Sequence, residues 1–483
     1  MEQNFIQEHH TEHRNNKNKG LNPFLLVPIS FAVVILLGSV LLYFPFSQKA
    51  LSWSHWGDWK NYIDCLFTAV SCTCVTGLNV FKNGIGEDLT FFGQLVCLIM
   101  IQIGGLGFIT VLAFFITLFR RKIRFRNRYF LQQAVNSTSF GNVISFVRKI
   151  ILISFSTELL GTLLLLPVFH HAFPDNVGMM VWASIFHSVS SFCNAGFDIM
   201  GSTSLIDSAG SWAANLPHWA YVYLCVVTML LIVFGGISFL VILEVFSFKK
   251  PKQYRVFTKI VLLTTAILLV GGSLFFILFE CFKGENSMTV LDAVFQSVTC
   301  RTAGFATYDQ TDLSVASRIA SCFLMFIGGS PLSTAGGIKT TTVFMVVLAV
   351  FSYVTGREVN AFKRKYSVNM VVKAMALIAV SGFVIAVCYV GLNAIESMNT
   401  AYYEAAELDR AASLFFETIS AFGTVGLSMN VTTELLWGSK LVLCVLMFIG
   451  RLGPMALFNI FQNNINIESK KHFAYVEEDF LIG

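Results

Sequence analysis

The sequence predicts an all-α integral membrane protein with eight full transmembrane helices, arranged as four span–reentrant pore loop–span repeats around one pseudo-fourfold pore. Three observations predict this fold. Only 13% of the 483 residues are charged, 55% are hydrophobic and the mean hydropathy is +0.68, which is too apolar for a soluble surface. Long apolar stretches recur along the chain, and short glycine-containing motifs recur between them.

The apolar stretches have the length that a membrane span requires. A transmembrane helix needs about 20 consecutive, mostly apolar residues. Stretches of this kind are residues 23–44, 89–119, 220–243, 260–279, 319–338 and 441–461. The first two contain no charged residue, and the last contains only Arg451.

Lys and Arg concentrate in a few short loops between the spans, where acidic residues are almost absent. They are Arg120, Arg121, Lys122, Arg124, Arg126 and Arg128, then Lys249, Lys250, Lys252, Arg255 and Lys259, then Arg357, Lys363, Arg364 and Lys365. Cytoplasmic loops carry the Lys and Arg excess, so these loops are expected in the cytosol of a multi-pass plasma-membrane protein. The polar tails 1–20 and 467–483 are then both cytoplasmic. The clusters favour contacts with anionic membrane lipids rather than nucleic acid, because each lies directly between apolar spans.

A first motif divides the chain into four repeats. It ends in Gly77-Leu78, Gly196-Phe197, Gly304-Phe305 and Gly426-Leu427. These marker glycines are 119, 108 and 122 residues apart. The predicted repeats are residues 21–122, 123–250, 251–362 and 363–466, and the third contains a broken second helix.

A second motif follows in each repeat, at the middle of its second span. It reads Ile103-Gly104-Gly105-Leu106, Phe234-Gly235-Gly236-Ile237, Ile327-Gly328-Gly329-Ser330 and Ile449-Gly450-Arg451-Leu452. Two independent motifs that recur in the same order indicate internal repetition rather than chance.

The short apolar pieces before the markers, such as residues 63–71 and 411–420, are about half a span long and predict reentrant segments. Non-helical backbone at membrane depth is tolerated only where protein buries it or water lines it. Four such loops would present rings of carbonyl oxygens, the arrangement that replaces the hydration shell of an ion in potassium filters. The predicted selectivity filter is Val75, Thr76, Gly77, Asn194, Ala195, Gly196, Thr302, Ala303, Gly304, Thr424, Val425 and Gly426. The alternative is that the glycines only pack helices closely, but four matched positions favour the filter.

The second span of the third repeat is interrupted by glycines and a proline, and it predicts a gate below the filter. The predicted gate residues are Gly328, Gly329, Ser330, Pro331, Gly336, Gly337, Lys339 and Arg451. Proline and glycine weaken a helix, so this span is expected to open into an intramembrane loop. A simple kink is the alternative. Gly328 and Gly450 both lie 24 residues past their markers, which places Arg451 at the same depth. A charge at that depth is expensive and suggests function, although an ion pair with Glu158 is an alternative.

Other chemistry finds little support. The eleven cysteines lie mostly inside apolar stretches and show no disulfide or metal-ligand spacing. The fragment Gly337-Ile338-Lys339-Thr340 does not match a phosphate-binding loop, so no nucleotide site is expected on this chain. A membrane-embedded hydrolase or a carboxylate exchanger would need clustered acids, whereas Asp64, Glu158 and Glu417 lie apart and form no motif. We therefore expect a protein that is not an enzyme.

These motifs resemble those of the Trk/Ktr/HKT superfamily of cation transporters. The resemblance covers about residues 23–483 and rests on Val75–Leu78, Thr302–Phe305, the run FIGGSPLSTAGGIKTTT at 326–342, Phe448–Arg451 and the ending at 474–483. The first marker follows a single span, which favours the Ktr branch. Two departures are the sulfur atoms of Cys72 and Cys74 beside the first filter segment, and Leu332 where the family commonly has glycine.

The resemblance implies the activity and the partners. It implies channel-like potassium uptake by a homodimer with one pore per subunit, bound to a cytoplasmic ring of nucleotide-binding RCK subunits. In this superfamily a serine at the first marker accompanies sodium transport, so Gly77 argues for potassium. A sodium-selective transporter of the same fold is the alternative, and the sequence leaves any dependence of potassium uptake on sodium open.

Overall fold

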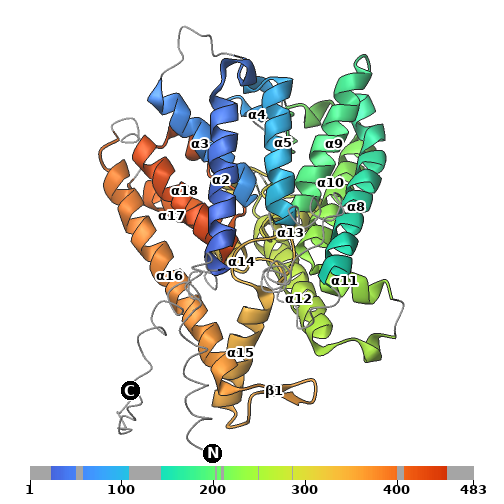
Figure 1. Ribbon diagram of the computed structural model, residues 1–483, viewed down its shortest axis with the longest axis vertical. Coiled ribbons are helices and arrows are strands. Elements are labelled where there is room, and N and C mark those ends of the chain that lie inside the picture. Colours follow the sequence, from blue (N-terminus) through green and yellow to red (C-terminus); the bar gives the residue numbers. More distant parts are fainter. Residues whose placement is uncertain are drawn as a thin grey trace, which may run out of the picture.

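The computed structural model describes residues 23–49, 58–107, 143–201, 204–207, 211–247, 250–284, 287–399 and 407–453. These residues form mainly helices, most of which run along the long axis of the molecule (Figure 1). Both predicted polar tails, the basic loop at 120–128 and the ending at 474–483 lie outside the described residues.

The described helices follow the same order four times: a helix, a shorter helix that ends in a loop, and a further helix. The first unit contains α2 (Pro23–Tyr43), α3 (Trp59–Cys74), α4 (Gly84–Asp88) and α5 (Phe91–Leu106). The second contains α8 (Val143–Ala172), α9 (Val177–Cys193), α10 (His218–Gly236) and α11 (Phe239–Val245). The third contains α12 (Val256–Glu280), α13 (Val290–Thr299), α14 (Val315–Phe326) and α15 (Thr340–Val354). The fourth contains α16 (Val368–Glu396), α17 (Glu407–Gly423) and α18 (Trp437–Leu452). A small hairpin, β1 (Asn360–Ala361) and β2 (Arg364–Lys365), joins α15 to α16.

The four units close into a ring. The last helix of each unit packs against the short helix of the next: α5 against α9, α10 against α13, α14 against α17, and α18 back against α3. An ion pair of 2.6 Å between Lys440 of α18 and Asp64 of α3 joins the two ends of the chain in this ring. The short helices therefore surround a common centre.

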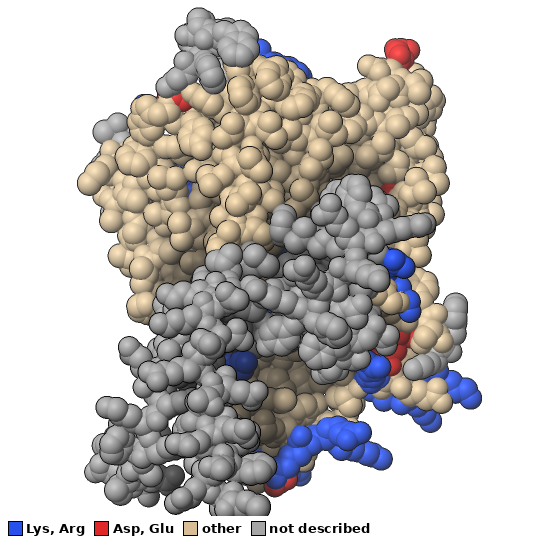
Figure 2. All heavy atoms as spheres, in the orientation of Figure 1, with Lys and Arg blue, Asp and Glu red and all other residues tan. Residues whose placement is uncertain are grey.

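Among the described residues, four helices are long and apolar enough to cross a membrane: Ser145–Ala172, His218–Gly236, Val256–Glu280 and Val368–Glu396. Their outer faces expose large apolar side chains, for example Leu152 at 71% and Val390 at 66%. Described Lys and Arg residues instead gather at the end of the molecule that holds β1 and α15 (Figure 2). An apolar belt with a basic end is what a lipid-embedded protein presents.

The short helices are longer than predicted in three units. The structure gives 16 residues to α3 and 17 each to α9 and α17, whereas α13 has 10. At 1.5 Å per residue the longest reach only about 26 Å, which is less than the roughly 30 Å of the hydrocarbon core. The expected span at 220–243 is also interrupted, because α10 ends at Gly236 and α11 begins at Phe239. The carbonyls of Gly235 and Gly236 accept hydrogen bonds from the third unit instead of continuing the helix.

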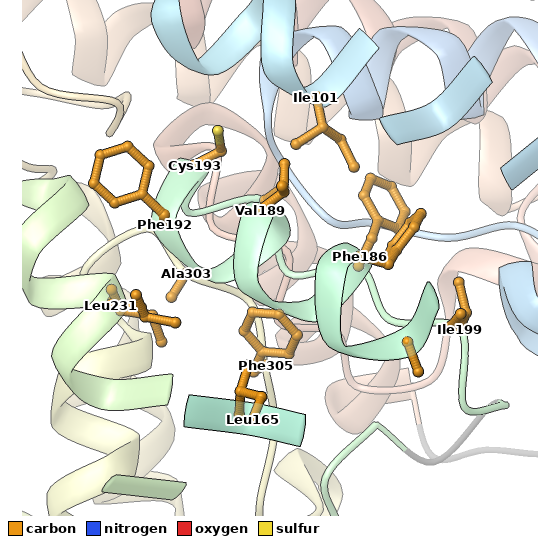
Figure 3. Close-up of a cluster of buried hydrophobic side chains, with 14 of the residues drawn as sticks. Ile101, Leu165, Phe186, Val189, Phe192, Cys193, Ile199, Leu231, Ala303 and Phe305 are labelled. Carbon is orange, nitrogen blue, oxygen red and sulfur yellow. The ribbon is translucent and has the colours of Figure 1, made fainter. Parts of the chain in front are cut away.

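The core around α9 shows how each short helix is wedged between its neighbours. Phe186, Val189 and Phe192 are buried between Ile101 of α5, Leu165 of α8 and Leu231 of α10 (Figure 3). Phe305, which follows the third marker glycine, fills the space beside Leu165. Buried aromatic side chains of this size fix the short helix in place.

Glycines of the second motif allow the last helix of a unit to approach the end of its short helix. A Cβ on Gly104, Gly235 or Gly450 would lie 1.9–2.0 Å from a carbonyl oxygen, that of Thr73, Phe192 or Phe422. These carbonyls belong to the residue four positions before each marker glycine. Close backbone approach through small residues is the usual packing mode of membrane helices.

Candidate functional site: a ring of four glycine loops

The four predicted filter segments share one backbone conformation. The first residue of each is left-handed, with φ of 58° at Val75, 59° at Asn194, 73° at Thr302 and 50° at Thr424. The marker glycines are left-handed as well, with φ of 98° at Gly77, 69° at Gly196, 85° at Gly304 and 96° at Gly426. Glycine adopts this region without the penalty that a Cβ brings. The repeated sequence motif thus corresponds to a repeated backbone turn.

The marker glycines meet in a closed ring. A Cβ on Gly77 would lie 2.6 Å from the carbonyl oxygen of Ala195, and one on Gly196 would lie 2.5 Å from that of Ala303. A Cβ on Gly304 would lie 2.4 Å from the carbonyl oxygen of Val425, and one on Gly426 would lie 2.2 Å from that of Thr76. Each glycine therefore faces the middle residue of the next segment, and the fourth faces the first. These contacts involve eight of the twelve predicted filter residues, and the other four directly precede them in the chain.

Serine hydroxyls hold three of the four loops from behind. The N–H groups of Gly77 and Gly426 donate to the Oγ atoms of Ser71 and Ser420, at 3.2 and 3.1 Å. In the second loop the N–H of Phe197 donates to Ser190 Oγ at 3.0 Å. All three serines lie six residues before their marker. Val298 occupies this position in the third repeat, where Thr299 Oγ1 donates instead to the Phe305 carbonyl at 2.6 Å.

A cavity of ≈ 340 Å³ opens on one side of the ring. All four marker glycines line it, together with the residue two positions after each of them: Asn79, Asp198, Ala306 and Ser428. Asp198 is buried, and its Oδ1 accepts a hydrogen bond from the Met200 N–H at 3.0 Å. A carboxylate and a ring of carbonyl oxygens are oxygen ligands suited to a weakly held cation.

A buried carboxylate supports the fourth loop. Glu417 of α17 is fully buried and accepts hydrogen bonds from the hydroxyls of Ser428, at 3.1 Å, and Thr432. Both hydroxyl-bearing residues line the cavity. Asp64, the other acid of a short helix, pairs with Lys440 as described above. Each of the two acids thus has a structural partner, and they do not come together.

On the other side of the ring, the chain between α14 and α15 forms a compact loop with a narrow neck. This intramembrane loop, residues 327–339, is closed by a bridge between Ile327 and Ile338 near its two ends. A Cβ on Gly328 would lie 2.0 Å from the Gly336 carbonyl oxygen, so the two limbs touch there. Leu332 is left-handed, with φ of 58°, which is a conformation that glycine adopts more easily.

The intramembrane loop contacts the ends of the neighbouring short helices. Ser330 N–H and Thr334 N–H donate to the carbonyls of Gly236 and Gly235, each at 3.2 Å. Thr334 Oγ1 also donates to the Phe192 carbonyl at 3.2 Å, at the end of α9. The C-terminal part of the loop reaches the fourth repeat, because a Cβ on Gly336 would lie 2.0 Å from Thr424 Oγ1. The loop thus contacts two of the filter loops from the side of the residues that precede the marker glycines.

Three cations donate to carbonyls of this region. Arg451 donates to the carbonyl of Thr334 in the loop, and to those of Gly104 and, at 3.4 Å, Gly105 at the end of α5. Lys339 Nζ donates to the carbonyls of Ala335 at 2.8 Å and Gly336 at 3.5 Å. Arg301 Nη2 donates to the carbonyl of Gly328 at 2.8 Å. The eight predicted gate residues therefore lie together.

The alternative pairing of Arg451 with Glu158 is not formed. Glu158 instead accepts two hydrogen bonds from Gln102 Nε2, at 2.9 and 3.2 Å. Cys72 and Cys74 are buried within α3 and carry free thiols. Among the residues that the structure describes, no group of three or more His, Cys, Asp or Glu side chains is placed to hold a metal ion.

Sequence reasoning missed two sets of residues. The serines behind the filter were not identified, although their constant position six residues before the marker is visible in three repeats. Arg301 was also missed. It lies three residues before its marker, where the other repeats have Cys74, Cys193 and Gly423, so its charge was the available signal.

The chain is similar to known cation transport proteins. A family model described as "TrkH: Cation transport protein" matches residues 6–472. The Enterococcus hirae "Potassium/sodium uptake protein NtpJ" is 34% identical over 96% of this chain and 98% of its own length. The Bacillus subtilis "Ktr system potassium uptake protein B" is 35% identical over 94% of this chain and 96% of its own length. In fold, the chain is similar to the potassium transporter TrkH from Vibrio parahaemolyticus, with a TM-score of 0.66 at 20% identity, over 93% of this chain and 86% of that one.

Proposed function

Because the chain belongs to the TrkH family of cation transport proteins, which confirms the resemblance seen in its motifs, we propose that it takes up potassium through a pore along the axis of the glycine ring. The observation that carries the proposal is the closed ring of glycine–carbonyl contacts, which joins all four repeats. Carbonyl oxygens from twelve residues then line the path and replace the hydration shell of the ion. The hydroxyls of Thr76 and Thr424, which have no hydrogen-bond partner among the described residues, offer further oxygen ligands at the filter.

In this proposal the molecule is embedded with the cavity of ≈ 340 Å³ facing outward. Eight helices span the membrane and the four short helices enter it from the outer side. The basic end of the molecule, which holds β1 and α15 (Figure 2), faces the cytosol. An inside-negative potential of roughly 150 mV contributes about 3.5 kcal/mol per potassium ion, which suffices for several-hundredfold accumulation.

The intramembrane loop is proposed to gate the pore. It lies beneath the ring and is held by hydrogen bonds to the second repeat and to Arg451 of the fourth. A loop at this position blocks the path sterically, and the nearby charge of Arg451 repels an arriving cation. Conduction then requires the loop to move aside, and the groups that hold it by hydrogen bonds to carbonyls must then exchange those partners. A purely structural kink would not need a neck closed by Gly328 and Gly336.

We further propose a homodimer, with one pore per subunit, bound to a ring of nucleotide-binding regulatory subunits. One relative is the B protein of a Ktr potassium uptake system, and the exposed hairpin with Lys363, Arg364 and Lys365 offers a cytoplasmic contact surface. Copurification with a tagged regulatory subunit tests this. Full nucleotide-regulated transport by the purified chain alone would contradict it.

The test of ion identity is growth rescue. The chain is expressed in a bacterial strain that lacks potassium uptake, on limiting potassium, with and without sodium. Growth that requires this chain and potassium supports the proposal. The second candidate function is sodium-selective transport. It is suggested by the name of the Enterococcus relative, a potassium/sodium uptake protein, and disfavoured by Gly77. Sodium uptake without rescue at limiting potassium would favour that candidate.

A further inference from the structure

Arg301 is a buried cation directly before the third filter segment, Thr302–Gly304. It is only 7% exposed and lies between Cys300, which caps α13, and the left-handed Thr302. Burial of a charged group is costly unless strong hydrogen bonds compensate for the lost hydration. A guanidinium retained at this position therefore requires a specific partner.

The third loop lacks the serine that supports the other three and is held instead by Thr299, whose Oγ1 donates to the Phe305 carbonyl at 2.6 Å. Ser71, Ser190 and Ser420 each accept a hydrogen bond from their filter backbone, whereas Val298 at the equivalent position has no hydroxyl. The turn also differs. In the other repeats the N–H of the middle filter residue bonds the carbonyl five positions back, as in Thr76 to Ser71 at 2.8 Å, but Ala303 bonds Thr299, four positions back, at 3.0 Å.

Arg301 supplies a different attachment, to the intramembrane loop. Its Nη2 donates to the Gly328 carbonyl at 2.8 Å, at the neck where Gly328 touches Gly336. Thr340 N–H donates to the Gly329 carbonyl at 3.2 Å and closes the same neck. Among the described residues, the side chain of Arg301 thus links this neck to the filter loop that contains Ala303 and Gly304.

The other N–H groups of Arg301 allow it to exchange one hydrogen-bond acceptor for another. Its Nε and Nη1 have no hydrogen-bond partner in the described part of the chain. The guanidinium also borders a cavity of ≈ 20 Å³ between α10 and α12, which Gly236, Thr265 and Gly329 line as well. Such a volume admits about one water molecule. The bond to Gly328 can therefore be exchanged rather than simply lost when the neck shifts.

We infer that Arg301 is a positioning residue that couples the third filter loop to the intramembrane loop. With the loop in place, the bond to Gly328 holds the neck and the filter segment together. When the neck moves, Arg301 releases Gly328, and the backbone at Thr302 and Ala303 is freed to adjust. The inference rests on the proposed pore and gate, and it assigns to the third repeat the link between them.

The test compares full-length variants in proteoliposomes. Arg301→Gln removes the charge, and Arg301→Lys keeps a charge with less reach. Arg318→Gln is the matched control, because Arg318 of the same repeat also donates to a backbone carbonyl, that of Thr311 at 2.6 Å, but away from the filter. Potassium flux and the potassium-to-sodium ratio are measured for each, and again with residues 330–335 deleted.

We expect Arg301→Gln to raise potassium flux on the order of tenfold and to lower the potassium-to-sodium ratio, since a hydrogen bond to a charged group holds the neck. Arg301→Lys should fall between this variant and the wild type, and Arg318→Gln should match the wild type. With residues 330–335 deleted, the flux gain from Arg301→Gln should disappear, because the restraint on the neck is already gone. If the Gln variant does not fold, the Lys variant carries the same comparison.

A second readout does not depend on transport. A cysteine placed in the loop, Ser333→Cys, should react faster with a thiol reagent in the Arg301→Gln background than in the wild type. Equal labelling rates, or flux gains of the same size with and without the deletion, would overturn the coupling. Faster labelling without any potassium flux in the wild type would support the coupling and refute the proposed function.

Discussion

Replacing Gly77 by serine should weaken the discrimination between potassium and sodium, because the ring has no room for a side chain there. A Cβ at Gly77 would lie 2.6 Å from the Ala195 carbonyl oxygen, whereas ordinary contact begins near 3.4 Å, so the two must separate by about 0.8 Å. The φ of 98° adds about 1–2 kcal/mol of backbone strain for any other residue. Displacing one carbonyl of the ring should lower the potassium-to-sodium ratio about tenfold, the factor that about 1.4 kcal/mol of lost ion stabilisation produces.

The assay is uptake of each ion into proteoliposomes that contain purified variants. Gly284→Ser is the matched control, because Gly284 has φ of 93° but no atom of the described residues within 4 Å of its Cβ position. Gly426→Ser should be more damaging and reduce total flux as well, because its Cβ would lie 2.2 Å from the Thr76 carbonyl oxygen. An unchanged ratio in well-folded Gly77→Ser, or an equal fall in Gly284→Ser, would refute the filter assignment.

Three further predictions follow from the same contacts. Deleting residues 330–335 should raise potassium flux. Arg451→Ala should raise the flux by less, because Arg451 holds only one point of the loop. If flux falls or stays unchanged while the deletion variant still folds and binds potassium, the loop has a structural role and does not gate the pore. Asp64→Asn removes the ion pair with Lys440 that closes the helix ring. This should lower the free energy of unfolding by about 1–2 kcal/mol, because the pair is only partly exposed. A melting temperature in detergent equal to that of the wild type would contradict this prediction. Asp198→Asn should reduce potassium uptake several-fold at low ionic strength and much less at high salt. The reason is that the carboxylate attracts cations into the cavity and that salt screens this attraction. A reduction in uptake that does not depend on salt would indicate a structural effect instead.

Sequence reasoning identified the features that the local backbone imposes. The marker glycines were predictable because each one needs a left-handed φ and a face without a Cβ, and only glycine meets both demands. The interruption after Phe326 was predictable because Pro331 and its flanking glycines cannot continue a helix.

Features that depend on contacts between repeats were not predictable in this way. The end of α10 at Gly236 is one example, because its helix stops where Ser330 and Thr334 of another repeat take its last carbonyls. The partners of Arg451 are another: a charge at membrane depth indicates a partner, but backbone carbonyls of Gly104 and Thr334 leave no pattern in the sequence. Arg301 was also missed, although its acceptor Gly328 lies in the same repeat, because a backbone carbonyl 27 residues away leaves no pattern in the sequence.

The departures of the third repeat follow from one change in packing. In the other three repeats, the first glycine of the second motif faces the carbonyl at the end of the short helix, as Gly104 faces Thr73. Gly328 instead faces Gly336 of its own intramembrane loop. The nearest backbone contact of this glycine is thus with the intramembrane loop rather than with the short helix, and α13 is also the shortest of the four short helices. Its filter loop has no serine behind it and is held instead by Thr299, which donates to the Phe305 carbonyl, and by Arg301, which donates to Gly328. Among the described residues, the third repeat is therefore the one in which a charged hydrogen bond links the filter loop to the intramembrane loop.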